Sequence, residues 1–206
     1  MKLLMRSFVL LLFSFIAVFP AAFAAEPLSG KTVYVDAGHG GEDSGAVGNG
    51  LLEKDVNLEV AKLVDEKLKE EGADTVASRT DDTFLTLEDR VAKASKHASD
   101  LLISIHANSA VPEASGTETY FDSAYQAADS KRLASNIQER LPDALGTRDR
   151  GVKESGFYVI KNSQMPSVLV ELGFITNKTD ADKLESPEYQ EKAADAIADA
   201  VAAYYE

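Results

Sequence analysis

Residues 101–108, LLISIHAN, decide the fold of this chain. The run LLISI shows no alternation between a buried and a solvated face, so it predicts a strand that is covered on both sides. A second run of this kind, SVLVELGF at residues 167–174, lies further along the chain. Such strands are typical of parallel sheets in α/β proteins, where helices pack on both faces.

Other strand signals flank these two runs. Each is a short stretch rich in β-branched and aromatic residues that is bounded by glycine or polar residues. We predict strands at residues 31–38 (KTVYVDAG), 73–80 (ADTVASRT), 117–123 (TETYFDS) and 156–162 (GFYVIKN).

Helix signals alternate with the strands. Apolar residues recur at helical spacing from Val56 to Leu68, with Gly72 as a stop signal, and again over residues 125–141, where Pro142 should end the helix. The polar residues 142–155 predict a surface loop.

Two further helices carry start signals. Thr86 and Asp89 resemble a capping box that opens a helix running to Ala98, and Ser186 with Pro187 marks the start of a C-terminal helix. The alternation of strands and helices predicts one three-layer α/β domain.

The first 24 residues have the composition of a secretory signal peptide. Lys2 and Arg6 precede an apolar run over residues 8–19, and Ala22 and Ala24 provide the small-x-small pattern of a cleavage site before Ala25. We therefore predict a signal peptide at residues 1–24, a domain at residues 25–206, and a secreted protein without membrane association after signal removal. A retained membrane anchor is the alternative, although the apolar run is short for a membrane span.

Composition restricts the partners of this domain. The chain contains no cysteine, which excludes disulfides, a thiol nucleophile and thiolate metal ligands. The formal net charge is −13, and removal of Lys2 and Arg6 with the signal takes it to −15. With no basic run in residues 25–206, nucleic acid is not an expected partner. Oligomeric state is not predicted.

Two histidines and two glutamates are the candidate functional residues. His39 and His106 follow predicted strands, Glu171 lies within one, and Glu53 lies at the start of a predicted helix. Sites in α/β sheets gather beyond the carboxyl ends of strands, and His39, His106 and Glu171 fall at such ends, which favours their convergence. Two imidazoles and one carboxylate can bind Zn²⁺ and leave a position for water, while a further carboxylate moves the proton of that water. This pattern predicts a metal-dependent hydrolase.

Each residue also has a structural interpretation. His39 could hydrogen-bond its loop, although the three glycines of AGHGG favour a site loop. Glu53 could simply stabilise a helix N-terminus. His106 and Glu171 have apolar neighbours, where an unpartnered polar group is costly, so each must be partnered or functional. His97, in SKHAS, is interpreted as a surface residue at a helix C-terminus.

Six motifs, in a fixed order along the chain, resemble those of a known protein family. The spacing of the four candidate residues alone would not show this resemblance. The motifs are VDAGHGGEDSGA (35–46), LLEKDVNL (51–58), SRTDD (78–82), LISIHANS (102–109), GVKESGFYVI (151–160) and MPSVLVELGFITN (165–177). In this order the motifs resemble the zinc-dependent N-acetylmuramoyl-L-alanine amidases of bacterial cell-wall turnover. The resemblance implies a twisted, mixed, mostly parallel sheet flanked by helices on both faces.

The resemblance also implies roles for individual residues. His39, Glu53 and His106 would be the zinc ligands, and Glu171 would be the catalytic acid/base. Asn57 and Asn108 also fall within matching motifs and Arg150 directly precedes one, but none of the three receives a role. The implied substrate is peptidoglycan, cut at the amide between the lactyl group of N-acetylmuramic acid and L-alanine. Some relatives carry an extra helix that plugs the site after the strand matching TETYFDS, and the short connection here argues against such an insertion.

Three other functions remain open from the sequence. A zinc peptidase that cuts within the stem peptide would use the same metal chemistry. A non-catalytic wall-binding protein would need none of the four residues, and a glycosidase would use Glu53 and Glu171 without the histidines or a metal.

Overall fold

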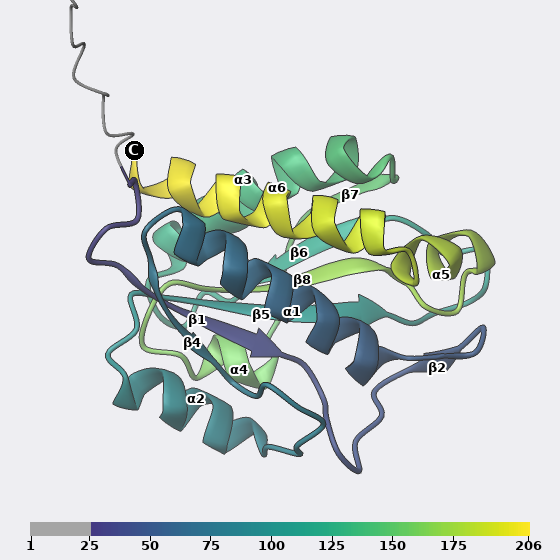
Figure 1. Ribbon diagram of the computed structural model, residues 1–206, viewed down its shortest axis with the longest axis horizontal. Helices are drawn as coiled ribbons and strands as arrows, with labels where there is room; N and C mark the ends of the chain where they lie inside the picture. Colours follow the sequence, from purple (N-terminus) through teal and green to yellow (C-terminus); the bar gives the residue numbers. More distant parts are fainter. Residues whose placement is uncertain (1–25) are drawn as a thin grey trace, which may run out of the picture.

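The apolar runs of the sequence form the inner strands of a six-stranded sheet. The computed structural model describes residues 26–206, so the predicted signal peptide lies outside the described residues. The strand order is β4-β1-β5-β8-β6-β7 (Figure 1). The strands are β1 (Thr32–Ala37), β4 (Asp74–Ala77), β5 (Leu101–Asn108), β6 (Thr117–Phe121), β7 (Asp149–Glu154) and β8 (Ser167–Phe174).

The sheet is mixed, and its direction changes once. Strands β4, β1, β5 and β8 are parallel, β6 pairs antiparallel with β8, and β7 pairs parallel with β6. A separate hairpin joins β2 (Val47–Gly48) to β3 (Leu51–Leu52). The predicted mixed, mostly parallel sheet is confirmed.

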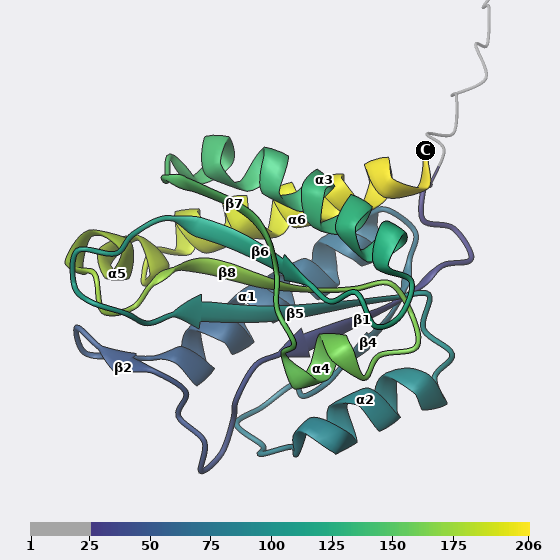
Figure 2. The ribbon, with the colours of Figure 1, turned by 180° about the vertical axis from the view of Figure 1, so that it is seen from behind.

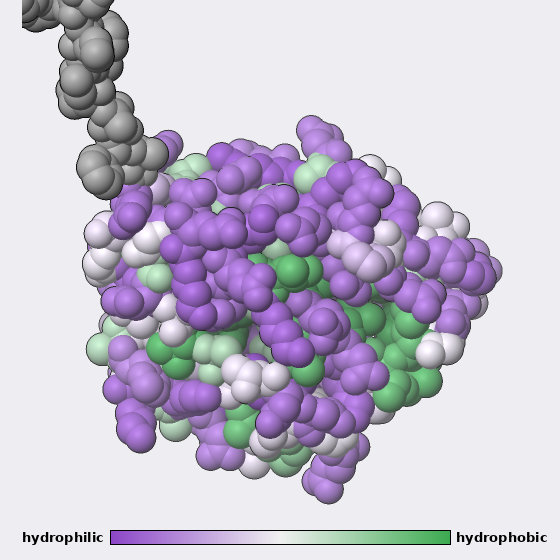
Figure 3. All heavy atoms as spheres, viewed as in Figure 1, coloured by the Kyte–Doolittle hydropathy of each residue, from purple (hydrophilic) through white to green (hydrophobic). Residues whose placement is uncertain are grey.

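Helices cover both faces of the sheet, but unequally. The long helices α1 (Glu53–Glu70), α3 (Ala127–Leu145) and α6 (Pro187–Tyr205) lie on one face, with α5 (Lys178–Leu184) at their edge. The shorter α2 (Leu87–Lys96) and α4 (Tyr158–Lys161) lie on the other (Figure 2). Figure 3, which looks onto the side with α1 and α6, shows mostly hydrophilic residues, with hydrophobic residues in the hollows between them.

Alternation along the strands divides the core in two. On β5, Ile103 and Ile105 belong to the large cluster under α1, α3 and α6, whereas Leu102 belongs to the smaller cluster under α2 and α4. Because successive residues of a strand point to opposite faces, His106 shares the face of Leu102. By the same rule, Glu171 on β8 shares the face of Leu169. His106 and Glu171 therefore lie on the face that α2 and α4 cover.

The predicted helix starts are confirmed. The Thr86 side chain accepts a hydrogen bond from the backbone N–H of Asp89 at 3.0 Å, which caps α2. Pro187 occupies the first turn of α6, where its missing N–H costs nothing. His97 is exposed and forms the C-cap of α2, as predicted.

Two predictions around Pro142 were wrong. Helix α3 continues through Pro142 to Leu145, because the fixed φ of proline suits a helix and Leu141 and Leu145 are both buried in the core. The predicted loop at 142–155 contains β7, which has one neighbouring strand only. A polar strand suits an edge, where its side chains meet water, and it gives no apolar signal in the sequence.

The predicted strand at residues 156–162 was also wrong. Residues Tyr158–Lys161 form the single turn α4. Adjacent Val159 and Ile160 are both buried against the smaller cluster, and a short apolar run of this kind does not separate strand from helix. Helix α5 and the β2–β3 hairpin were not predicted.

Two further features concern the surface and the connections. Among residues 26–206, no helix is both long enough and apolar enough to cross a membrane. Within this part of the chain, only residues 122–126 join β6 to α3, which leaves no room for an inserted helix.

Candidate metal centre

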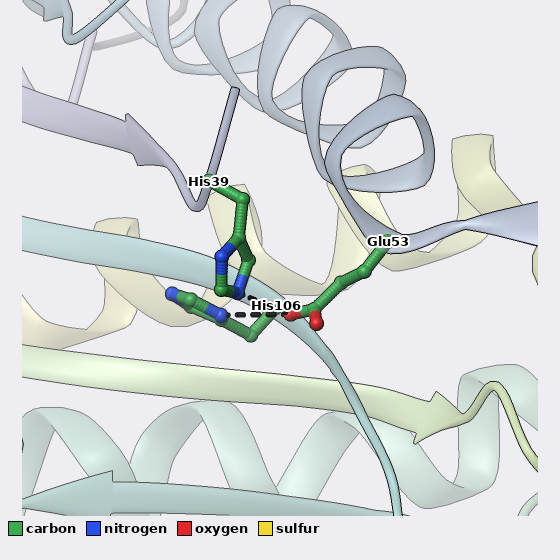
Figure 4. Close-up of side chains that lie close together, drawn as sticks. All are labelled: His39, Glu53 and His106. Atoms are coloured by element: carbon green, nitrogen blue, oxygen red, sulfur yellow. Dashed lines mark hydrogen bonds and ion pairs between the residues drawn. The ribbon is translucent and has the colours of Figure 1, made fainter. Parts of the chain in front are cut away.

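Three segments bring His39, Glu53 and His106 together at the carboxyl ends of β1 and β5 (Figure 4). His39 follows β1, Glu53 is the first residue of α1, and His106 lies on β5. One potential ligand atom from each lies within 4.8 Å of the other two. Glu53 Oε1 lies 3.2 Å from His39 Nε2 and 2.9 Å from His106 Nδ1. The sequence prediction that these three side chains converge is confirmed.

The loop after β1 depends on its glycines. His39 has a φ of 60°, and Gly40 and Gly41 also have positive φ. Gly38 has no room for a side chain, because an added Cβ would lie 2.3 Å from Cε1 of the His106 ring. Glycine at this position therefore allows the β1 backbone to pass close to the imidazole.

Two buried arginines hold the backbone of this loop. Arg90 donates to the carbonyl oxygens of Ala37 and His39, each at 2.6 Å, and forms an ion pair with buried Asp36 at 2.6 Å. Arg79 donates to the carbonyl oxygens of Gly38 and Lys54, at 3.0 and 2.7 Å. These bonds tie the loop that carries His39 to α2 and to the first turn of α1.

Asp43 orients the His39 ring. Its Oδ2 lies 2.8 Å from Nδ1 of His39, so the opposite ring nitrogen, Nε2, is directed at Glu53. A carboxylate behind a histidine fixes the ring orientation and tautomer in metal sites. Asn57 supports the same group, since its Nδ2 donates to Gly38 O at 3.3 Å and to Glu53 Oε1 at 3.4 Å.

The centre favours an ionised Glu53. Burial alone would raise the pKa of this carboxyl, but hydrogen bonds and charge from His106 and His39 outweigh burial and hold the pKa far below its usual range. Its oxygens also accept from the backbone N–H groups of Ala107, at 3.2 Å, and Ala46, at 2.8 Å. The cluster therefore offers one carboxylate and two imidazole nitrogens, a donor set that suits a divalent transition metal.

Glu171 lies beside this cluster with a different environment. It is the register partner of His106 between β5 and β8, and it is 8% exposed. Its Oε2 has no hydrogen-bond partner among the described residues. Burial first, and then the charges of Glu53 and Glu118, raise the pKa of Glu171 well above its usual range. A buried carboxyl of this kind, placed next to a site, is suited to proton transfer.

A fifth residue, Glu118, was missed by the sequence analysis. It is the register partner of Glu171 between β6 and β8 and is 2% exposed. Arg150 Nε donates to its Oε2 at 2.6 Å, and Lys153 also bonds this oxygen. Asn108 Nδ2 donates to its Oε1 at 2.7 Å. The alternation in TETYF was the available signal, since it puts Glu118 and Tyr120 on one face.

A cavity of about 320 Å³ adjoins the two histidines. Its wall is mainly apolar, and part of that wall is solvent-exposed, including Phe84 at 42%, Leu87 at 49% and Phe157 at 39%. His39 and His106 are among the residues that line the cavity. A substrate can therefore approach the cluster from this cavity.

Comparison with known proteins agrees with this geometry. The family model described as N-acetylmuramoyl-L-alanine amidase matches residues 33–203. The chain is 69% identical over 187 residues to YqiI of Bacillus subtilis (strain 168), with 91% of each chain covered. It is 57% identical over 182 residues to N-acetylmuramoyl-L-alanine amidase LytC of the same strain, which covers 87% of this chain but 36% of LytC.

A solved structure extends the comparison to the fold. The catalytic domain of CwlV, an N-acetylmuramoyl-L-alanine amidase from Bacillus (Paenibacillus) polymyxa var. colistinus, superposes with a TM-score of 0.79 at 39% identity. The match covers 84% of this chain and 97% of that domain. On the family match and these relatives, the chain belongs to the N-acetylmuramoyl-L-alanine amidase family.

Proposed function

We propose that this chain is a zinc-dependent amidase that cuts the bond between the lactyl group of N-acetylmuramic acid and L-alanine in peptidoglycan. The observation that carries the proposal is the convergence of His39, Glu53 and His106 beside Glu171 in a member of the amidase family. The similar proteins LytC and CwlV are both named as N-acetylmuramoyl-L-alanine amidases.

The residues fit a zinc ion. Zinc is bound by imidazole nitrogen and carboxylate oxygen, and catalytic sites use three protein ligands and leave a further position open. The cluster offers this donor set, and both imidazoles already direct a nitrogen at Glu53. We assign His39, Glu53 and His106 as the ligands. When bound, zinc would acidify a water molecule and polarise the substrate carbonyl.

Glu171 would move the protons of the reaction. As a carboxylate it would accept a proton from the attacking water, and as a carboxylic acid it would donate that proton to the departing alanine nitrogen. Its burial and its unpartnered Oε2 support this role, since no other described residue occupies that oxygen. The amine needs this proton because an unprotonated amide nitrogen is a poor leaving group.

We also propose that the protein acts outside the cytoplasm. Residues 1–24 would direct export and be removed, which would release residues 25–206 to the cell wall. Two observations support this proposal. Residues 1–24 have the composition of a signal peptide, and peptidoglycan, the proposed substrate, lies outside the cell membrane.

Mass spectrometry of products tests the proposed reaction. Purified peptidoglycan is incubated with residues 25–206, either zinc-loaded or treated with a chelator. We expect stem peptides with a free L-alanine amine from the zinc-loaded sample alone. Cuts within the stem peptide would make the protein a peptidase, and equal activity after chelation would contradict the zinc assignment.

A further inference from the structure

A row of ionisable side chains crosses the sheet from the metal cluster to its edge. His106 on β5 pairs in register with Glu171 on β8, and Glu171 pairs with Glu118 on β6. Residues in register point to the same face of a sheet. The row ends at Arg150 and Lys153 of β7, which both bond Glu118.

At the β7 end of this row, two cations bond a single carboxylate, although Asp149 and Glu154 also lie on β7. Glu118 contributes one negative charge against two positive charges, in a chain whose formal net charge is −13. The Arg150 side chain is 24% exposed and that of Lys153 is 36% exposed, whereas Glu118 is buried beneath them. Both cations can therefore accept an anionic ligand from solvent while they keep their bonds to Glu118.

The apolar cavity beside the histidines offers no comparable cation. Arg90 is the one cation among the described residues that line the apolar cavity. It is 2% exposed, and its donors are taken by Asp36 and by the carbonyl oxygens of Ala37 and His39. The site thus combines an apolar cavity wall with two partly exposed cations on β7.

The proposed reaction orients the substrate along the row that runs from His106 to β7. Glu171 delivers a proton to the departing nitrogen, so the peptide that this nitrogen belongs to lies on the Glu171 side of His106. Continuing across the sheet in that direction leads to Glu118, Arg150 and Lys153. Stem peptides carry free carboxylates, and guanidinium and ammonium groups bind carboxylates through charge-assisted hydrogen bonds.

We propose that Arg150 and Lys153 form a subsite that binds a carboxylate of the stem peptide. Buried Glu118 holds the two cations in place, and the subsite sets a preference for acidic over amidated stem peptides. This inference rests on the proposed function, because the orientation of the substrate follows from the role of Glu171.

Binding measurements test the subsite without relying on turnover. The probe is a synthetic stem tetrapeptide, N-acetylated at its L-alanine, with free carboxylates, and its partner is the same peptide with every carboxylate converted to an amide. Calorimetry of the zinc-incubated protein should show the acidic peptide binding about tenfold more tightly, the size expected for one partly exposed charge-assisted contact. Salt screens partly exposed charges, so the ratio of the affinities for the acidic and the amidated peptide should shrink as salt is added.

Substitutions of Lys153 distinguish a role in binding the peptide from a role in stabilising the fold. Lys153→Gln should lower the acid-to-amide affinity ratio clearly, because only Arg150 would remain, and Lys153→Arg should restore it. Lys131→Gln removes an exposed lysine of α3 on the opposite face of the sheet and should keep the wild-type ratio. A purely structural role for Lys153 would change stability but would leave the ratio unchanged.

Two results would overturn the subsite. The first is a wild-type acid-to-amide affinity ratio near one, which includes the case in which neither peptide binds. The second is a Lys153→Gln protein that keeps the wild-type ratio. Hydrolysis of an intact muropeptide by the same samples judges the amidase assignment separately, so a protein that discriminates between the peptides but cuts nothing would contradict the amidase alone.

Discussion

Glu118 and Glu171 face each other across the antiparallel pair of β6 and β8, yet their surroundings give them opposite properties. Burial alone would raise the pKa of Glu118, but bonds from Lys153, Tyr120 and Arg150 outweigh burial and lower it. Glu171 has no such partners, and its pKa is raised. Two neighbouring carboxyls with separated pKa values are typical of sites in which one group is structural and the other exchanges protons.

Replacement of Glu171 by glutamine should abolish most of the activity and leave metal binding intact. Glutamine keeps the size of the side chain but cannot accept and return a proton, so the rate should fall by about 10²–10⁴-fold. Initial rates on a muropeptide and zinc content by mass spectrometry check this. Glu139→Gln, an exposed position on α3, is the matched control. Near-normal turnover of a zinc-loaded Glu171→Gln protein would remove Glu171 from the mechanism.

Replacement of Asp43 by asparagine should weaken metal binding without removing a ligand. Asp43 holds Nδ1 of His39 at 2.8 Å, and loss of a partner behind a metal-bound histidine lowers affinity by about 10–100-fold. Competition with a chelating dye measures the zinc affinity directly. Glu42→Gln changes the exposed neighbouring acid and should have wild-type affinity. Equal affinities of the two variants would mean that Asp43 does not orient the ring.

Gly38→Ala should prevent assembly of the metal cluster. The added Cβ would lie 2.3 Å from the ring of His106, so the imidazole would have to move away from Glu53. We expect loss of stoichiometric zinc binding and destabilisation by about 1–3 kcal/mol. At Gly156 a Cβ would meet atoms no closer than 3.7 Å, so Gly156→Ala is the control. A Gly38→Ala protein that binds zinc as the wild type does would show that the loop can shift.

Asp36→Asn should destabilise the fold at neutral pH. Asp36 and Arg90 form a buried ion pair at 2.6 Å, and loss of one partner leaves the other charge uncompensated, at a cost of about 3–5 kcal/mol. Urea unfolding at pH 7 measures this difference. Lys62→Gln, which removes an exposed ion pair with Glu59, should cost less than about 1 kcal/mol.

The difference between wild type and Asp36→Asn should also depend on pH. Burial alone would raise the pKa of Asp36, but the charge of Arg90 and hydrogen bonds from Ser104 and Arg90 hold it below its ordinary value of 3.8. A lowered pKa stabilises the fold above the unfolded value, and this contribution is lost as the pH falls through the folded value. The difference in stability between the two proteins should therefore begin to shrink below about pH 4 and go on shrinking as the pH falls further. A constant difference from pH 7 to pH 3 would show that the charge of Asp36 is not responsible.

The sequence predicted the metal cluster because its residues lie in strong local signals. His39 stands among glycines, His106 ends an apolar strand, and Glu171 interrupts one, so each contrasts with its neighbours. Glu53 was predicted through family resemblance, since a carboxylate at a helix N-terminus is common.

The β7 side of the site could not be predicted in the same way. Glu118 stands between two threonines, and Arg150 and Lys153 lie in a polar segment that looks like a loop. Their roles arise from the pairing of β6 with β7 and β8, which joins segments that are far apart in the chain. Sequence periodicity reports which face a residue occupies, but it does not report which strand lies next to it.

The two ends of the described chain lie together, away from the metal cluster. The side chain of Lys31, just before β1, packs over the ring of Tyr205 near the end of α6, with its Nζ 4.7 Å from the ring centroid. The parallel strands start at that end of the molecule and the cluster lies beyond their carboxyl ends (Figure 1). An affinity tag or solid support attached at either of these two ends would therefore leave the cleft facing outward. The enzyme could then be immobilised on beads and still meet an insoluble polymer such as a cell wall.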